Sequence, residues 1–335
     1  MTRVEQTLPP ARGFTEAEVD QLLRAVQAAP SVDNSQPWRI TVFADQVEVC
    51  TDPYLDAPVA DPVGRQRVIS TGAALFNLRL SLRVLGRQVT IRLFPDADRP
   101  GLVALVTAQP GPPPTPEEQR LYEAIVQRRT WRAPFGLLPL PDGAAAQLAD
   151  DAAREGAMLV PVASHADRDR LADLLVTAVA DQLADPDRAA EQQAWLRTGP
   201  AEDGIPLTNL VQARYPIPGL PAPDPLAGPD DWRPTVRGLA YHDTLALLVT
   251  RADEPCDWVL AGSALQRVLL TATRFGLATG FLNQPLESEV RRQALTETLA
   301  VPGYPQMLLR LGYPASPPPP PTPRRGIVRR TGGGS

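Results

Sequence analysis

The stretch GAALFNLRLSLRVLG, residues 72–86, predicts a long helix that is apolar on most faces and ends at a glycine. A second stretch of equal length, GSALQRVLLTATRFG at residues 262–276, matches it at Gly, Ala, Leu, Leu and Gly. Each is followed by a strand-like run, and a helical pattern opens each half at residues 15–29 and 116–127. A helix apolar on most faces must be covered all round. We therefore expect an α+β fold in which two tandem halves pack as an internal pseudo-dimer around a shared helical core.

Proline-rich segments suggest the division of the chain. The run QPGPPPTPEE separates the halves, and a longer proline-containing run at residues 199–234 exceeds ordinary loop length. We expect a first half at residues 1–110, a linker at 111–116, a second half at 117–325 containing a lid-like loop at 199–234, and a tail at 326–335.

Composition excludes several classes of function. The 335 residues carry a net charge of −5, which gives no global attraction to nucleic acid or anionic membrane. No stretch has the apolar length of a membrane span and no leader pattern opens the chain, so a cytoplasmic protein is expected. All 33 basic residues are arginine, which excludes a Schiff-base or Walker A lysine. The two cysteines and two histidines are isolated, so no metal site is predicted.

Motifs for common nucleotide sites and hydrolases are absent: there is no GxGxxG, GxSxG or HExxH. Instead, PSVDNSQPW at residues 30–38 follows a helix with a Thr15–Glu18 capping box. It holds more hydrogen-bonding side chains than a turn requires. This excess predicts a binding loop.

Three other segments could bind a ligand. In RRTWR, residues 128–132, extended geometry would place Arg128, Thr130 and Arg132 on one face as a phosphate cradle; a solvated helix end is the alternative. TPRR at 322–325 is either a second source of cations or a disordered arm. LNQPLE at 282–287 offers amides at a strand's end, or is a simple turn.

Together these segments resemble the nitroreductase superfamily of FMN-dependent oxidoreductases, and in particular its Acg-like branch of single-chain FMN-binding proteins. AAPSVDNSQPW is similar to the family's PS..N.QPW motif; GAALFNLRLSL, RRTWRAPF, LNQPLE, QMLLRLGY and TPRR follow in the expected order. Ordinary members build two sites from two identical chains. Here PSVDNSQPW lies in the first half and the other site motifs lie in the second, which implies one complete FMN site per chain.

The resemblance implies a role for each site segment. Cations from RRTWR and TPRR would bind the phosphate, Arg132 would lie near the N1/O2 edge of the flavin, and Gln284 with Asn283 would face N5. Common members carry Glu-Gly at those last two positions, so this chain departs from the pattern there. Loop 30–38 would bind the pyrimidine and ribityl edges. The expected cofactor-binding residues are Pro30, Ser31, Asn34, Gln36, Arg128, Arg129, Thr130, Arg132, Asn283, Gln284, Arg324 and Arg325.

The function implied is that of an oxidoreductase taking hydride from NAD(P)H to FMN and passing it to a nitroaromatic, quinone or similar acceptor. No catalytic side chain is required, because the cofactor supplies the chemistry. Two alternatives remain open: an FMN store with a closed lid and little turnover, and a biosynthetic tailoring flavin dehydrogenase. An internal pseudo-dimer is compatible with a monomer or a homodimer.

Overall fold

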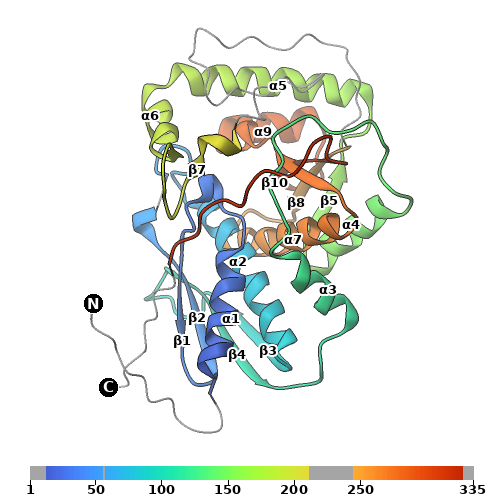
Figure 1. Cartoon of the computed structure of the whole chain (residues 1–335). Coiled ribbons are helices and arrows are strands. Elements are labelled where there is room, and N and C mark those ends of the chain that lie inside the picture. Colours follow the sequence, from blue (N-terminus) through green and yellow to red (C-terminus); the bar gives the residue numbers. More distant parts are fainter. Residues whose placement is uncertain (1–12, 56, 211–243, 327–335) are drawn as a thin grey trace.

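The computed structural model describes residues 13–55, 57–210 and 244–326. The first half forms a four-stranded antiparallel sheet in the order β1-β2-β4-β3, with helices α1 and α2 packed on it (Figure 1). Its elements are α1 (Glu16–Gln27), a 3-10 turn η1 (Val32–Asn34), β1 (Trp38–Val42), β2 (Gln46–Thr51), a 3-10 turn η2 (Pro53–Leu55), α2 (Arg65–Val84), β3 (Arg87–Leu93) and β4 (Leu102–Pro110).

The second half contains another four-stranded antiparallel sheet, in the order β5-β8-β10-β9. Its elements are α3 (Pro116–Ala124), α4 (Ala144–Arg154), β5 (Met158–Pro161), α5 (His165–Ala184), α6 (Pro186–Ala194), β6 (Leu196–Arg197), β7 (Ile205–Pro206), a 3-10 turn η3 (Leu207–Asn209), β8 (Thr244–Thr250), α7 (Pro255–Arg274), β9 (Ala278–Phe281), α8 (Gln284–Glu287), α9 (Glu289–Thr298) and β10 (Tyr304–Gly312).

The two sheets share one topology. In each half two strands precede the long helix and two follow it, and the order of strands across the sheet is the same. The α+β class is confirmed, and the helices predicted at residues 72–86 and 262–276 are parts of α2 and α7, which begin earlier, at Arg65 and Pro255. The two-fold relation expected of a pseudo-dimer stays a prediction.

Helices α2 and α7 pack directly against each other between the sheets. The contact is closest at the repeat's first glycine: a Cβ on Gly262 would lie 2.0 Å from the carbonyl oxygen of Ile69, and one on Gly72 would lie 2.3 Å from that of Val259. Polar groups also pair across it, where the Gln266 side chain donates to Asn77 Oδ1 at 2.8 Å. The glycines therefore allow a backbone approach that any larger residue would prevent.

Both long helices end in the way the sequence predicts. Gly86 and Gly276 each follow the C-terminal turn with φ of +71°, the left-handed conformation that glycine adopts without strain. A strand starts immediately afterwards in both halves, at Arg87 and at Ala278. The capping box of Thr15 and Glu18 is also present at α1. The repeated glycine thus turns each buried helix back onto its own sheet.

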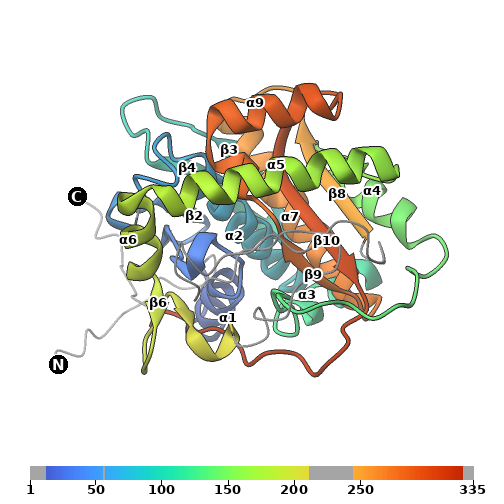
Figure 2. The same cartoon turned by 90° about the horizontal axis from the view of Figure 1, so that it is seen from above.

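Helices α4, α5 and α6 are among the elements that the sequence did not predict. Helix α5 runs across the molecule above α2, α7 and β10, and α6 follows it toward the first half (Figure 2). Within the described residues no helix is long and apolar enough to cross a membrane. Only residues 199–210 of the expected lid-like loop are described; its Tyr215, Ile217 and Trp232 lie outside the described residues, and the boundaries between halves, linker and tail stay predictions.

Candidate functional site

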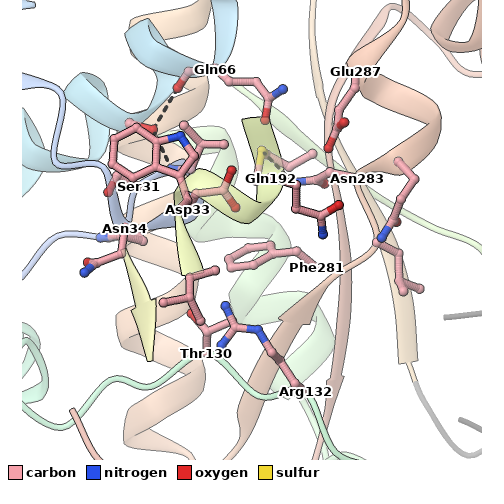
Figure 3. Close-up of a pocket in the computed structure, with 18 of the residues that line it drawn as sticks. Ser31, Asp33, Asn34, Gln66, Thr130, Arg132, Gln192, Phe281, Asn283 and Glu287 are labelled. Atoms are coloured by element: carbon pink, nitrogen blue, oxygen red, sulfur yellow. Dashed lines mark hydrogen bonds between the residues drawn. The ribbon is translucent and has the colours of Figure 1, made fainter. Parts of the chain in front are cut away.

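A cavity of about 320 Å³ lies where the two halves meet. Its walls come from loop 30–34, the start of α2, residues 128–132, helices α5 and α6, the β9–α8 turn and the C-terminal segment (Figure 3). Such a volume suits a small organic ligand. Segments far apart in sequence therefore converge on one site.

The loop after α1 has an unusual backbone. Asp33, Asn34 and Gln36 have φ of 47°, 56° and 52°, a region that non-glycine residues rarely occupy. Ser31 Oγ accepts a hydrogen bond from Gln36 N at 3.0 Å, and Ser70 Oγ on α2 accepts one from Val32 N at 3.2 Å. Three of the four residues at positions 33–36 thus have positive φ. Contacts with the surrounding structure must hold this strained backbone, as is common at binding sites.

The side chain of Asn34 fixes this loop to two other segments. Its amide donates to the carbonyl oxygens of Gly204 and Pro323, both at 2.9 Å, and its Oδ1 accepts from Arg324 at 2.7 Å. Gln36 similarly donates to the Glu202 carbonyl at 3.0 Å and accepts from Arg325 N at 2.9 Å. In Figure 3 the Asn34 amide points away from the cavity. Both amides thus tie the loop to residues 202–204 and 323–325.

A cluster of arginines forms one end of the cavity. Arg128 is buried, its Nε and Nη1 have no hydrogen-bond partner, and its Nη2 lies 3.5 Å from the Ala28 carbonyl. Burial, with smaller contributions from the cations of Arg324, Arg129 and Arg132, lowers the pKa of Arg128 to about 9. Burial and the nearby Arg129 lower the pKa of Arg324 to about 10. Within the described residues Arg128 has no carboxylate partner, so the cluster is suited to an anion.

The segment 128–132 is fixed to the second sheet by a bridge between Thr130 and Thr279. Trp131 N donates to the Thr279 carbonyl on β9 at 2.7 Å, and the buried Trp131 indole donates to the Pro134 carbonyl at 3.1 Å. Arg128, Thr130 and Arg132 line the large cavity. Arg129 instead lines an adjoining cavity of about 190 Å³ that also contains Arg128 and Arg324. The two cavities thus share the cationic end.

The β9–α8 turn supplies the amides at the other end. Asn283 Oδ1 accepts from Leu308 N at 2.9 Å, whereas Gln284 Oε1 is buried with no partner. The buried Arg65 at the start of α2 holds this turn, donating to the carbonyls of Leu286 at 2.6 Å and Gln306 at 3.0 Å. An arginine of the first half therefore positions a turn of the second.

Helices α5 and α6 close the remaining wall with Val179, Gln182, Leu183, Arg188 and Gln192. Arg188 donates to Glu287 Oε2 at 2.9 Å and Gln182 donates to the same oxygen at 2.7 Å. Burial raises the pKa of Glu287 to about 7, against the opposing attraction of Arg188. Glu191 accepts from Val59 N and Ala60 N at 2.9 and 2.8 Å, which fastens α6 to the first half.

The family model named Nitroreductase family matches residues 125–313. A Mycobacterium tuberculosis (strain H37Rv) protein provisionally named NAD(P)H nitroreductase Rv3131 is 36% identical over 305 residues, 90% of this chain and 86% of that protein. The chain belongs to the nitroreductase family. The M. tuberculosis protein provisionally named NAD(P)H nitroreductase acg is 30% identical over 304 residues, 89% of this chain and 90% of that protein, which confirms the Acg-like branch. A Bacteroides fragilis nitroreductase solved with bound FMN has a TM-score of 0.39 and 16% identity over 62% of this chain and 96% of that one.

Most residues that the sequence assigns to the site of this nitroreductase-family chain lie together. The large cavity is lined by Pro30, Ser31, Asn34, Arg128, Thr130, Arg132, Asn283, Gln284 and Arg324. Arg129 lines the adjoining cavity, Gln36 is buried within its loop, and the Arg325 side chain pairs with Asp203. Their contacts with FMN stay predictions.

Sequence reasoning missed several cavity residues. Asp33 lies in PSVDNSQPW and Glu287 lies in LNQPLE. A charged side chain within a predicted binding motif could have identified each of them as a cavity residue. Gln66 and Ser70 lie on the first turns of α2, before the helix that the sequence predicts at residues 72–86. For Arg188 and Gln192 the sequence offered no motif.

Proposed function

We propose that the chain is an FMN-dependent oxidoreductase of nitroreductase type that binds one FMN, takes hydride from NAD(P)H and passes it to a nitroaromatic, quinone or similar acceptor. The proposal is carried by one observation. Within the described residues, the buried guanidinium of Arg128, whose Nε and Nη1 have no partner, lies in the same cavity as the strained loop of the first half and the β9–α8 turn of the second. Family membership and the names of the relatives support it.

The residues present fit FMN. Arg128 and Arg324 would hold the phosphate, because one is a buried cation, the other is a half-buried cation, and neither has a carboxylate partner among the described residues. Thr130 and Ser31 offer hydroxyls to the ribityl chain, and Gln284 Oε1 is a buried acceptor still without a donor. When bound, FMN would supply the two-electron chemistry of the reaction. The protein would bind it, orient it and control what reaches it.

Asn34 and Gln36 would act by positioning. Their amides are occupied by the backbone around Gly204, Pro323 and Arg325, so they would keep the loop in its left-handed conformation beside the cofactor. Arg325 would do the same through Asp203. In this assignment Arg128 and Arg324 would bind the phosphate, and Arg325 would only help to position the loop.

The test is the double variant Arg128→Gln, Arg324→Gln, matched with Arg120→Gln on the exposed face of α3. A hydrogen bond to a charged group contributes about 1.5–3 kcal/mol, so losing two should raise the Kd for FMN by about 100-fold or more. The wild type and the control should purify yellow with about one FMN per chain. A double variant that folds and keeps stoichiometric FMN with unchanged Kd would refute the phosphate assignment.

A second candidate, an FMN store with little turnover, is favoured by how the cavity is covered. Residues 202–204 are hydrogen-bonded to Asn34 and Gln36, and α6 is fastened to the first half through Glu191. Anaerobic mixing of the yellow protein with NADPH and with NADH separates the two functions. Rapid bleaching followed by recolouring with a nitroaromatic or a quinone supports the enzyme, and the absence of bleaching with either nucleotide supports the store.

A further inference from the structure

Asp33 is a carboxyl group in the cavity that makes no direct contact with a cation among the described residues. It occupies the left-handed position at φ 47° in the loop of the first half, and Figure 3 shows its side chain directed into the cavity, toward Gln192. Within residues 13–55, 57–210 and 244–326 no hydrogen bond or ion pair to this carboxyl is found. Its neighbour Asn34, by contrast, is fully bonded. The loop thus holds one residue as an anchor and presents the next to the cavity.

The charges around Asp33 come from three elements. Arg188 and Glu191 lie on α6, Arg132 lies in the segment after α3, and Glu287 lies on α8. Arg188 is already committed to Glu287 through its Nε and Nη2. Glu191 already accepts hydrogen bonds from two backbone donors, Val59 N and Ala60 N. Three carboxyl groups therefore lie near the guanidinium groups of Arg188 and Arg132, and within the described residues Asp33 is the one of the three that makes no hydrogen bond.

We propose that Asp33 is a catalytic residue that donates a proton to the acceptor, and that the acceptor class is a quinone or similar compound whose oxygen gains negative charge as it is reduced. This inference rests on the proposed function. Burial raises the pKa of Asp33, which keeps its carboxyl group protonated to a higher pH than an exposed aspartic acid. A neutral acid in a cavity is the form that can donate.

The balance of the reaction requires one such proton. Overall, NAD(P)H loses a hydride as its nicotinamide C–H bond breaks, and NAD(P)⁺ leaves. One quinone oxygen gains the hydrogen with its electron pair, and negative charge develops on the other. The O–H bond of Asp33 breaks as a new O–H bond forms on that oxygen, giving the hydroquinone. The Asp33 carboxylate then regains a proton from water.

The variant that tests this is Asp33→Asn, because asparagine adopts the left-handed conformation readily and keeps the side-chain shape. Asp45→Asn, an exposed carboxyl in the first half, is the matched control. In stopped flow, reoxidation of the reduced holoprotein by 1,4-naphthoquinone should slow about 100-fold or more in Asp33→Asn. Reduction by NAD(P)H and reoxidation by ferricyanide, which takes up an electron without a proton, should stay within about twofold.

Two further readouts complete the test. In wild type the quinone rate should fall as pH rises through the raised pKa of Asp33, whereas the slow rate of Asp33→Asn should not depend on that group. In infrared titration of the oxidised protein, which needs no turnover, one protonated-carboxyl band should be present in wild type and in Asp45→Asn and lost in Asp33→Asn, whereas the band of Glu287, whose pKa is about 7, should remain in all three.

Equal slowing with ferricyanide and naphthoquinone, or protonated-carboxyl bands all unchanged by Asp33→Asn, would overturn the role of Asp33. Wild type that binds FMN and bleaches with NAD(P)H in those experiments would leave the proposed function intact. Wild type that neither binds FMN nor bleaches would overturn the proposed function, and this inference with it.

Discussion

Substituting Gly262 by alanine should separate the two central helices. In an ordinary helix interior this change stabilises by about 0.5–1 kcal/mol, because glycine is the more flexible residue when unfolded. Here the new Cβ would lie 2.0 Å from the Ile69 carbonyl oxygen and 2.8 Å from Ala73 N, where ordinary contacts begin at 3.4 Å. Both atoms are backbone, so no side chain can move aside. The helices must therefore move apart by more than about 1 Å. Each affected pair of atoms then loses roughly a quarter to a half of its dispersion energy.

We expect Gly262→Ala to lower the free energy of unfolding by about 3 kcal/mol, at the upper end of overpacking costs. Urea denaturation followed by far-UV circular dichroism measures it. Gly199→Ala is the control, since a Cβ there meets nothing within 4 Å and should change stability by less than about 0.5 kcal/mol. FMN affinity should also fall, because Ile69 and Leu265 of the same helices line the cavity. Stability equal to or above wild type would show that helix propensity, and not the close approach, controls this position.

Two smaller changes test how the halves are joined at the site. Arg65→Met leaves the buried carbonyls of Leu286 and Gln306 without their donor, so it should lower the free energy of unfolding by roughly 2–4 kcal/mol in the same denaturation assay. Arg92→Met, on an exposed face of β3, should change it little. Equal losses of stability in the two variants would contradict a joining role for Arg65. Glu191→Gln replaces a charged acceptor of the Val59 and Ala60 amides by a neutral, weaker one. Amide hydrogen exchange should therefore become faster in α6 but not in α9. Unchanged exchange in α6 would mean that Glu191 does not hold α6 to the first half.

The central helices were predictable because their signal is local. A run of apolar residues followed by Gly86 or Gly276 predicts that the helix is buried and also where it ends. The α+β class followed from finding that signal twice. The sequence could not show that Gly72 and Gly262 face each other, because a close approach depends on two segments and is visible only once both are placed.

The site was predictable to the extent that its residues stand in motifs. RRTWR, TPRR and LNQPLE each carry side chains that line one cavity, so quoting the motifs found most of its wall. The wall made by α5 and α6 has no motif because its contribution is geometric. Arg188 reaches Glu287 across 99 positions of sequence, and neither residue shows by its neighbours that the other is its partner.

Asp33 and Asn34 show why a motif cannot assign roles within itself. The two residues are adjacent and of similar size, both at positive φ, and the sequence favoured Asn34 as the ligand. In the structure the Asn34 amide satisfies Gly204, Pro323 and Arg324, three groups brought to it by folding, while the Asp33 carboxyl receives no such partner among the described residues and points into the cavity. An asparagine both donates and accepts, so it can join three segments at once, whereas an aspartic acid at that position could not donate to both carbonyls. Exchanging the two residues would therefore lose the anchor and the acid together, and this complementarity gives the order Asp-Asn a physical reason.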